Sequence, residues 1–183
     1  MTSVTPGPNN TYLLTSGMNF GVKKSLAYVN GIMAGLIIMF SAMYLGVGAL
    51  FKAYPIIQEV LKYAGFAYIL YMAYSIIKSS FVHRHEAVQR AGFFRATAFQ
   101  MVNPKAWIVV MSVVAAYIPI NATPTTAVIT LAIFLITTYP GAVIWAAFGE
   151  LLAGWLSKPA PRRIFNFTAA LLLVISMIPV LFL

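Results

Sequence analysis

The amino-acid sequence predicts an all-α fold: a polytopic membrane helix bundle of about six segments in two inverted three-helix halves. Apolar residues make up 61% of the 183 residues and charged residues 8%, with no aspartate. A soluble domain carries roughly 25% charged residues. Several uncharged stretches reach the about 20 residues that a helix needs to cross the hydrocarbon core. We therefore expect a single integral membrane domain over residues 1–183.

Five stretches are long and apolar enough to cross a membrane. They are Leu26–Leu50, Ile56–Ile77, Ala96–Ile118, Thr126–Phe148 and Ile164–Leu183.

A shorter segment, Thr11–Phe20, precedes these five stretches and cannot cross alone. Only five residues lie ahead of Pro6, so we expect a truncated first helix and a reading frame that extends upstream of Met1. The two half-repeats then cover about residues 1–78 and 94–183, with a basic loop at 79–95 between them.

The basic residues predict the orientation of the bundle. Nine of them lie in three alternate loops, against Lys52 and Lys62 in the others. The nine are Lys23, Lys24, Lys78, Arg84, Arg90, Arg95, Lys158, Arg162 and Arg163. Because positive loops stay in the cytoplasm, these loops should be cytoplasmic and the C-terminus outside the cell (inner) membrane. Short basic loops between apolar spans do not indicate nucleic-acid binding.

Other function classes find little support. The chain has no cysteine, which excludes disulfides and thiol chemistry. His83, His85 and Glu86 share a loop but form a poor metal-ligand set. The sequence has no aspartate pair, no histidine on a span and no Gly-x-Ser-x-Gly motif, so we expect neither an enzyme nor a cofactor.

Lys105 is a charged residue inside a predicted apolar span. It follows Asn103 and Pro104 and precedes 44 uncharged residues. It lies ten residues beyond Arg95, or about 15 Å along a helix, near the middle of a core about 30 Å thick. Charges at that depth are costly and usually mark a site. We expect Lys105 to face a cavity and to contact a substrate carboxylate or change protonation state.

Two prolines indicate broken helices at matching positions. Pro8 and Pro104 are 96 residues apart, each in the first segment of its half. Three segments per half invert the second half, and broken helices in inverted repeats indicate a transporter's binding site. Proline frees backbone groups that hydrocarbon does not tolerate unpaired. Half-helix N-termini favour a carboxylate, and exposed carbonyls favour an ammonium.

The candidate substrate-binding residues surround these breaks. They are Pro6, Gly7, Pro8, Asn9, Asn10, Asn103, Pro104 and Lys105. The alternative is that they only kink or cap helices.

Two further candidates and one interface are less specific. Tyr68 begins a tyrosine stripe that lines a cavity or serves only packing. Glu150 is a coupling carboxylate or an interfacial acid near Lys158. Gly31 and Gly35 form a Gly-xxx-Gly that fits either bundle packing or a homodimer.

Several of these motifs occur together in one known family. Thr5–Asn10, with the glycines after it, resembles the N-terminal signature of the LysE/RhtB superfamily of amino-acid exporters. Lys62–Tyr68 is similar to the start of that family's third helix, and Gln100–Trp107 to its Asn-Pro-Lys motif. Trp145 and Gly149 are similar to its fifth-helix pattern. The Pro-Gly-Pro-Asn-Asn variant looks most like exporters of cysteine, O-acetylserine or neutral amino acids.

The resemblance implies a six-helix inner-membrane exporter driven by an ion gradient, with the proton as the expected ion. The leading hypothesis is secondary active efflux of a small amino acid or amino-acid derivative. The alternatives are an accessory subunit of a larger membrane complex and a metal-ion exporter of the same superfamily. Scarce acids and absent cysteine weigh against the metal-ion exporter.

Overall fold

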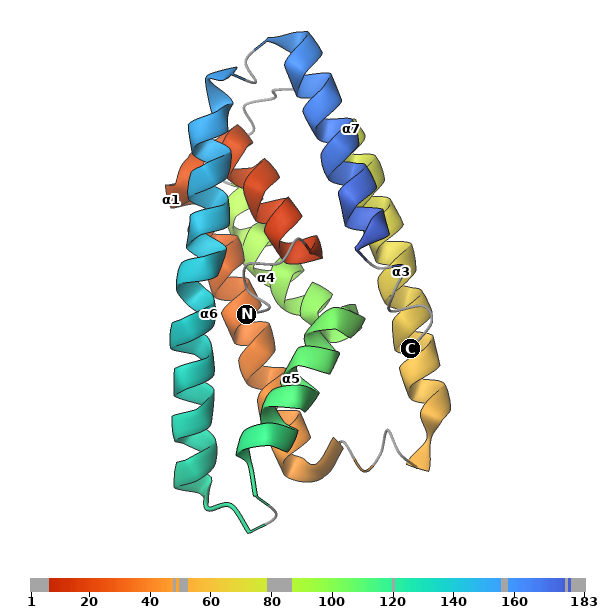
Figure 1. Cartoon of the computed structure of the whole chain (residues 1–183), viewed down its shortest axis with the longest axis vertical. Helices are drawn as coiled ribbons and strands as arrows, with labels where there is room; N and C mark the ends of the chain where they lie inside the picture. Colours follow the sequence, from red (N-terminus) through yellow and green to blue (C-terminus); the bar gives the residue numbers. More distant parts are fainter. Residues whose placement is uncertain are drawn as a thin grey trace.

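The computed structural model describes residues 7–47, 49, 53–78, 87–119, 121–155, 158–176 and 178. Pro6, most of the basic loop and the last five residues therefore lie outside the described residues. The elements are α1 (Pro8–Ala42), the π-helical turn η1 (Met43–Val47), α3 (Pro55–Ile77), α4 (Ala87–Val102), α5 (Pro104–Tyr117), α6 (Pro124–Ala153) and α7 (Pro159–Ile175). These described elements are all helical, which confirms the all-α fold class (Figure 1).

Proline sets where most of these helices begin. It occupies the first helical position of five of them, where its missing N–H costs nothing and its fixed φ fits the helix. The five prolines are Pro8, Pro55, Pro104, Pro124 and Pro159.

The helix α1 folds back on itself at Gly21. That residue has φ 78° and ψ 168°, a conformation open almost only to glycine. Tyr12 stacks on Tyr28 with ring centroids 4.0 Å apart. In a straight helix these residues would be about 24 Å apart. The segment from Pro8 to the break therefore forms a short first arm beside the rest of α1. The sequence predicted a short helical segment over Thr11–Phe20 but not that it folds back.

The chain bends again between α4 and α5. Their axes differ by 71° across the single residue Asn103, which has φ −84° and ψ 101°. A residue before proline avoids the helical region, so Pro104 accounts for the position of this break. The span predicted over Ala96–Ile118 is thus two half-helices.

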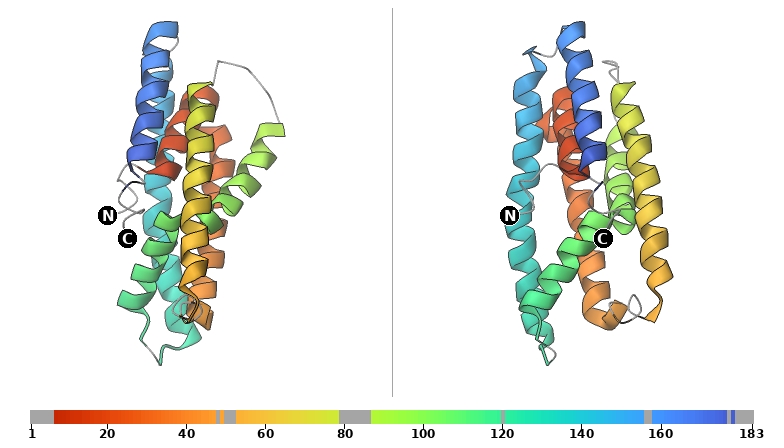
Figure 2. Two further views of the ribbon diagram at one scale, coloured as in Figure 1. Left: turned by 90° about the vertical axis from the view of Figure 1, so that its right-hand side faces the viewer. Right: turned by 45° about the vertical axis from the view of Figure 1, so that its right-hand side comes forward.

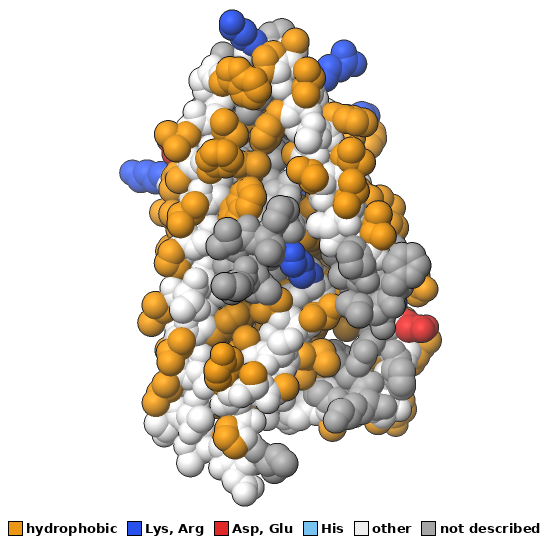
Figure 3. Space-filling view, viewed as in Figure 1, with side chains coloured by type: hydrophobic (Ala, Val, Ile, Leu, Met, Phe, Trp, Pro, Cys, Tyr) orange, Lys and Arg blue, Asp and Glu red, His pale blue; other side chains and the backbone are white. Residues whose placement is uncertain are grey.

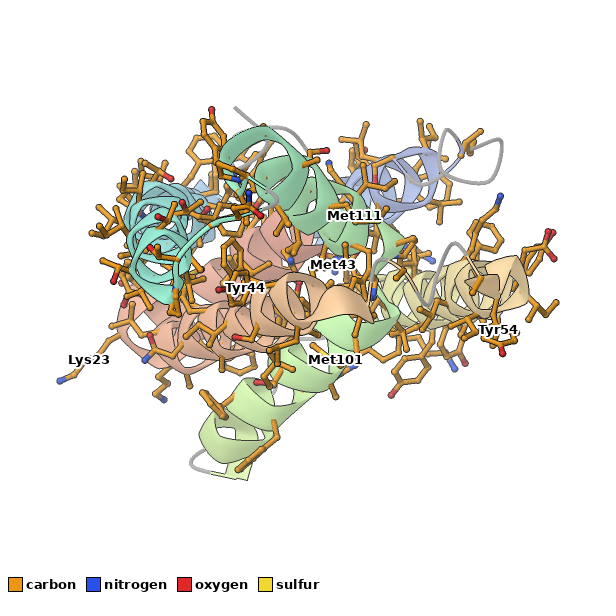
Figure 4. The ribbon with its side chains drawn as sticks, turned by 90° about the horizontal axis from the view of Figure 1, so that it is seen from below. Lys23, Met43, Tyr44, Tyr54, Met101 and Met111 are labelled. Carbon is orange, nitrogen blue, oxygen red and sulfur yellow. The ribbon has the colours of Figure 1, made fainter. Side chains whose placement is uncertain are left out.

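The helices pack into two groups. In one, α1 lies against α6 and α4 around a core that includes Phe40 and Val110. In the other, α3 and α7 lie side by side along one edge of the molecule, around Ile69 and Leu173 (Figures 1 and 2). Figure 4 shows Tyr54 on this edge and Lys23 pointing outward on the opposite side. Phe99 of α4 joins the second core and links the two groups.

The surface is that of a membrane protein. Large aliphatic side chains on α6, such as Ile136 and Val128, are 70% and 65% exposed. Hydrophobic side chains cover the face in Figure 3, and Lys and Arg side chains gather at its upper end.

Fewer helices than expected are long and apolar enough to span a membrane by themselves. Among the described residues Pro8–Val47 and α6 qualify, and the bent pair α4–α5 makes a third if counted as one span. Five such spans were expected. Part of the difference arises because Asn103 divides one predicted span and because the described apolar helix in the last one covers only Arg163–Ile175.

Candidate functional site

A pocket lies where the start of α1 meets the junction of α4 and α5. Its cavity volume is about 90 Å³, well below the roughly 300 Å³ at which pockets for drug-sized ligands begin. The lining residues come from α1, α4, α5, α6 and the two breaks. They are Gly7, Pro8, Asn9, Asn10, Ile32, Leu36, Gln100, Asn103, Lys105, Ala106, Val109, Phe134, Thr138 and Ala142. The pocket therefore brings the two proline breaks together, although they are 96 residues apart in sequence.

Two helix N-termini meet at this pocket. The helix α1 begins at Pro8 after Gly7, and α5 begins at Pro104 after Asn103. Gly7 has no side chain that could cap α1, and the side chain of Asn103 makes no capping hydrogen bond to α5. First-turn amides have no partner within a helix, and the helix dipole adds partial positive charge there. This end of the pocket thus favours an anionic group.

Lys105 adds a full positive charge to the same end. A β-carbon built on Gly7 would lie 2.8 Å from its Nζ, so the ammonium lies against the backbone of the first break. The absence of a side chain at residue 7 leaves that space to Lys105. A lysine at the centre of a membrane helix costs about 2.5–3.5 kcal/mol on insertion scales. The described residues that line the pocket include no acid.

Asn103 supplies a hydrogen-bond acceptor. Its side chain is 2% exposed, and its Oδ1 has no hydrogen-bond partner among the described residues. A buried polar atom without a partner costs about 1–3 kcal/mol. Since Asn103 also lines the pocket, an N–H or ammonium group of a ligand is the natural partner for this oxygen.

The side-chain amides of Asn9 and Gln100 connect the start of α1 to the end of α4. Asn9 donates to Gln100 Oε1 at 2.9 Å, and Gln100 donates back to Asn9 Oδ1 at 3.0 Å. Gln100 also donates to the backbone carbonyl of Ala96 at 3.1 Å. Gln100 is fully buried. These two hydrogen bonds join the start of α1 directly to the last turn of α4.

Two of the predicted site residues lie elsewhere. Tyr68 does not line the pocket. Instead its hydroxyl accepts a hydrogen bond from Arg95 Nε at 3.1 Å, and its ring stacks on Phe99 at 4.7 Å. Pro6 lies outside the described residues, whereas the other seven residues predicted at the breaks line the pocket or, like Pro104, lie buried between two lining residues.

Glu150 is the second predicted residue away from the pocket. It lies on α6, and its Oε2 accepts the backbone N–H of Val22 at 2.8 Å. Val22 follows the break at Gly21. This carboxylate therefore caps the N-terminus of the longer part of α1, which runs from Val22 to Ala42, and a negative charge is stabilising at a helix N-terminus.

The sequence analysis did not predict that α6 also lines the pocket, through Phe134, Thr138 and Ala142. A signal was present in the sequence. Two threonines and a tyrosine precede Pro140, a proline inside an otherwise apolar helix. Polar residues next to an intrahelical proline are the same pattern that identified the other two breaks.

The arrangement fits a zwitterion that carries an apolar side chain. Positive charge lies at one end, an unpaired acceptor lies beside it, and aliphatic and aromatic side chains form the rest of the wall. Within the part of the chain that the structure describes, no three His, Cys, Asp or Glu residues come together to hold a metal ion.

An apolar helical bundle with a charged pocket at two helix N-termini, one of them at a break between half-helices, has the features of a membrane translocator. The chain belongs to the LysE type translocator family, whose profile it matches over residues 1–179. It is 28% identical over 128 residues to a leucine efflux protein of Enterobacter sp. strain 638, covering 66% of this chain and 60% of that protein. It is 29% identical over 137 residues to a leucine efflux protein of Klebsiella pneumoniae, covering 71% and 65%.

A leucine efflux protein of Salmonella typhimurium is 28% identical over 123 residues, covering 64% of this chain and 58% of that protein. The matches thus span about six tenths of the length of these relatives. No solved structure matches the chain.

Proposed function

We propose that the protein exports a small neutral amino acid, or a derivative of one, across the cell membrane by secondary active transport. The observation that carries this proposal is the convergence of Lys105, Asn103 and two helix N-termini on one pocket. The names of the relatives, which are leucine efflux proteins, support an amino-acid substrate with an apolar side chain.

The charges of the pocket orient such a substrate. The carboxylate lies against Lys105 and the N-termini of α1 and α5, where positive charge is concentrated. The ammonium donates to Asn103 Oδ1, which has no hydrogen-bond partner among the described residues. The side chain then lies against the apolar wall. In this orientation the helix N-termini bind the substrate's carboxylate, as the N-termini of discontinuous helices do in other transporters.

The driving ion and the orientation complete the proposal. We assign coupling to a proton, with Glu150 as the candidate carrier. Basic side chains gather at one end of the molecule in Figure 3, and the positive-inside rule places that end in the cytoplasm.

The competing functions have less support. An accessory subunit would need no charged pocket at the helix N-termini, and a metal-ion exporter would need ligands that the described residues do not bring together.

Export from whole cells tests the proposal. Cells expressing the protein are loaded with leucine, alanine or other amino acids as dipeptides, and the extracellular amino acid is measured. We expect Lys105→Met to lower efflux at least about tenfold, because a hydrogen bond to a charged group contributes roughly 1.5–3 kcal/mol. Lys23→Met is the matched control, because Lys23 is exposed at the turn of α1. Efflux by Lys105→Met equal to that of the parent, at equal membrane abundance, would refute a role for the pocket.

A further inference from the structure

We propose that Phe134, Thr138 and Ala142 select the substrate's side chain, and that they favour an aliphatic side chain of about the size of leucine's. We name these three residues the α6 stripe. This inference rests on the proposed function and adds the residues that determine specificity within the pocket.

The α6 stripe is a continuous surface. Its three residues are spaced four apart, which places them on one face of a helix. All three line the same pocket as the polar groups of the two helix N-termini. Their side chains decrease in size from Phe134 through Thr138 to Ala142. A substrate whose charged end is held by Lys105 and Asn103 can then place its side chain against this wall.

The stripe is held at a fixed distance from the pocket's polar end. A β-carbon on Gly17 would collide with the backbone of Ala146, and one on Gly149 would collide with the backbone of Leu14. The first arm of α1 and α6 thus touch backbone to backbone on either side of the same contact. Because Ala146 is one turn beyond Ala142, the stripe cannot retreat from α1 to make room for a larger side chain.

The chemistry of the pocket excludes charged basic side chains. Its lining holds no carboxylate, and the three acids of the chain are Glu59, Glu86 and Glu150. A lysine or arginine substrate would bury its side-chain cation near Lys105 without a counter-charge, which is strongly unfavourable.

Size excludes aromatic side chains. The cavity is about 90 Å³, and the ring of Phe134 is part of its wall. In so small a cavity we expect a branched aliphatic side chain to be accepted more readily than an aromatic ring, which has a larger volume. Apolar pockets discriminate by roughly 10–200-fold for each methylene of misfit.

Counterflow into proteoliposomes of the purified protein tests this inference, with radiolabelled leucine, phenylalanine and alanine as the probes. For Phe134→Ala we expect kcat/KM for phenylalanine relative to leucine to rise by roughly tenfold or more. For Ala142→Val we expect leucine to lose at least about tenfold relative to alanine, because two added methyl groups at this lining position reduce the space left for the substrate's side chain. Phe148→Ala is the matched control, since Phe148 is on the same helix, 50% exposed and outside the pocket.

Folding is checked by size-exclusion profile and thermal unfolding of each variant. Phe134→Leu removes less volume and keeps the test informative if Phe134→Ala does not fold. Unchanged substrate ratios in Phe134→Leu and Ala142→Val would overturn the inference. If Lys105→Met abolishes counterflow while those ratios stay at parent values, the central site stands and the stripe does not. If Lys105→Met transports like the parent, the proposed site and the inference both fall.

Discussion

At the scale of single residues, the pocket combines two polar groups that an apolar bundle should not contain without a reason. Lys105 keeps a charge near the middle of the chain's apolar region, and Asn103 keeps a buried acceptor without a partner among the described residues. Both are costly in a medium of low dielectric constant. A ligand with a carboxylate and an ammonium complements both groups, the carboxylate by its charge and the ammonium as a donor to Asn103 Oδ1, which favours an amino acid over a ligand with a single charge.

Asn103 allows the binding role to be separated from a structural role. Its side chain makes no capping hydrogen bond for α5. We therefore expect Asn103→Ala to leave thermal stability unchanged or slightly raised, since a buried unsatisfied group is removed. The KM for leucine should rise about tenfold, the effect of losing a charge-assisted hydrogen bond of at least about 1.5 kcal/mol.

Transport kinetics and thermal unfolding of the same preparation measure both effects for Asn103→Ala. Asn30→Ala, at an exposed position on α1, serves as the control. A large loss of stability with an unchanged KM would assign Asn103 to structure instead.

At the scale of elements, the sequence predicted the breaks better than the packing around them. Proline and its polar neighbours fix where a helix stops, because the cause is local backbone chemistry. The start of α1 at Pro8 and the half-helices on either side of Asn103 therefore follow from the sequence. The α6 wall does not, because which face of an apolar helix meets a pocket depends on contacts such as Gly17 with Ala146. For Tyr68, the tyrosine stripe could be recognised in the sequence, but the contacts with Arg95 and Phe99 that determine its role could not.

The turn within α1 depends on one glycine. Gly21 has φ 78° and ψ 168°, which costs other residues of the order of 1–3 kcal/mol. We expect Gly21→Ala to lower the free energy of unfolding by about that amount and to reduce transport, because the turn positions the first arm at the pocket. Thermal unfolding of the purified protein measures the first effect.

Gly154→Ala is the control for Gly21→Ala. Gly154 has helical φ and ψ angles, and an added β-carbon there meets nothing within 4 Å. Equal melting temperatures for the two variants would show that α1 can turn without this conformation.

At the scale of the whole molecule, the two cores do not coincide with the two halves of the sequence. The helix α1 packs on α4 and α6, and α3 packs on α7, so each core draws helices from both halves. An inverted repeat accounts for this arrangement if corresponding helices exchange partners across the pseudo-symmetry axis. The interval between the prolines indicates a repeat, but it contains no information about which helices pair. The half-repeats 1–78 and 94–183 remain a prediction.

The helix α6 connects the pocket with the carboxylate of Glu150. It carries the stripe at its middle and Glu150 near its end, where Glu150 holds the N–H of Val22 beyond the turn of α1. If Glu150 takes up the coupling proton, the neutral acid is a weaker cap for a helix N-terminus than the carboxylate. Protonation would then loosen the turn that positions the first arm of α1. This route links ion binding to the pocket through contacts present in the structure.

Glu150→Gln tests that route. A glutamine oxygen can still accept the Val22 N–H but, like the protonated acid, it lacks the negative charge. We therefore expect a melting temperature slightly below that of the parent, with counterflow retained when no pH gradient is applied. The same variant should lose accumulation driven by a pH gradient across proteoliposomes, because it can no longer bind and release a proton. Glu59→Gln, on the exposed surface of α3, is the matched control. Accumulation by Glu150→Gln at the parent level would show that Glu150 caps the helix without coupling, and that the proton or another ion acts elsewhere.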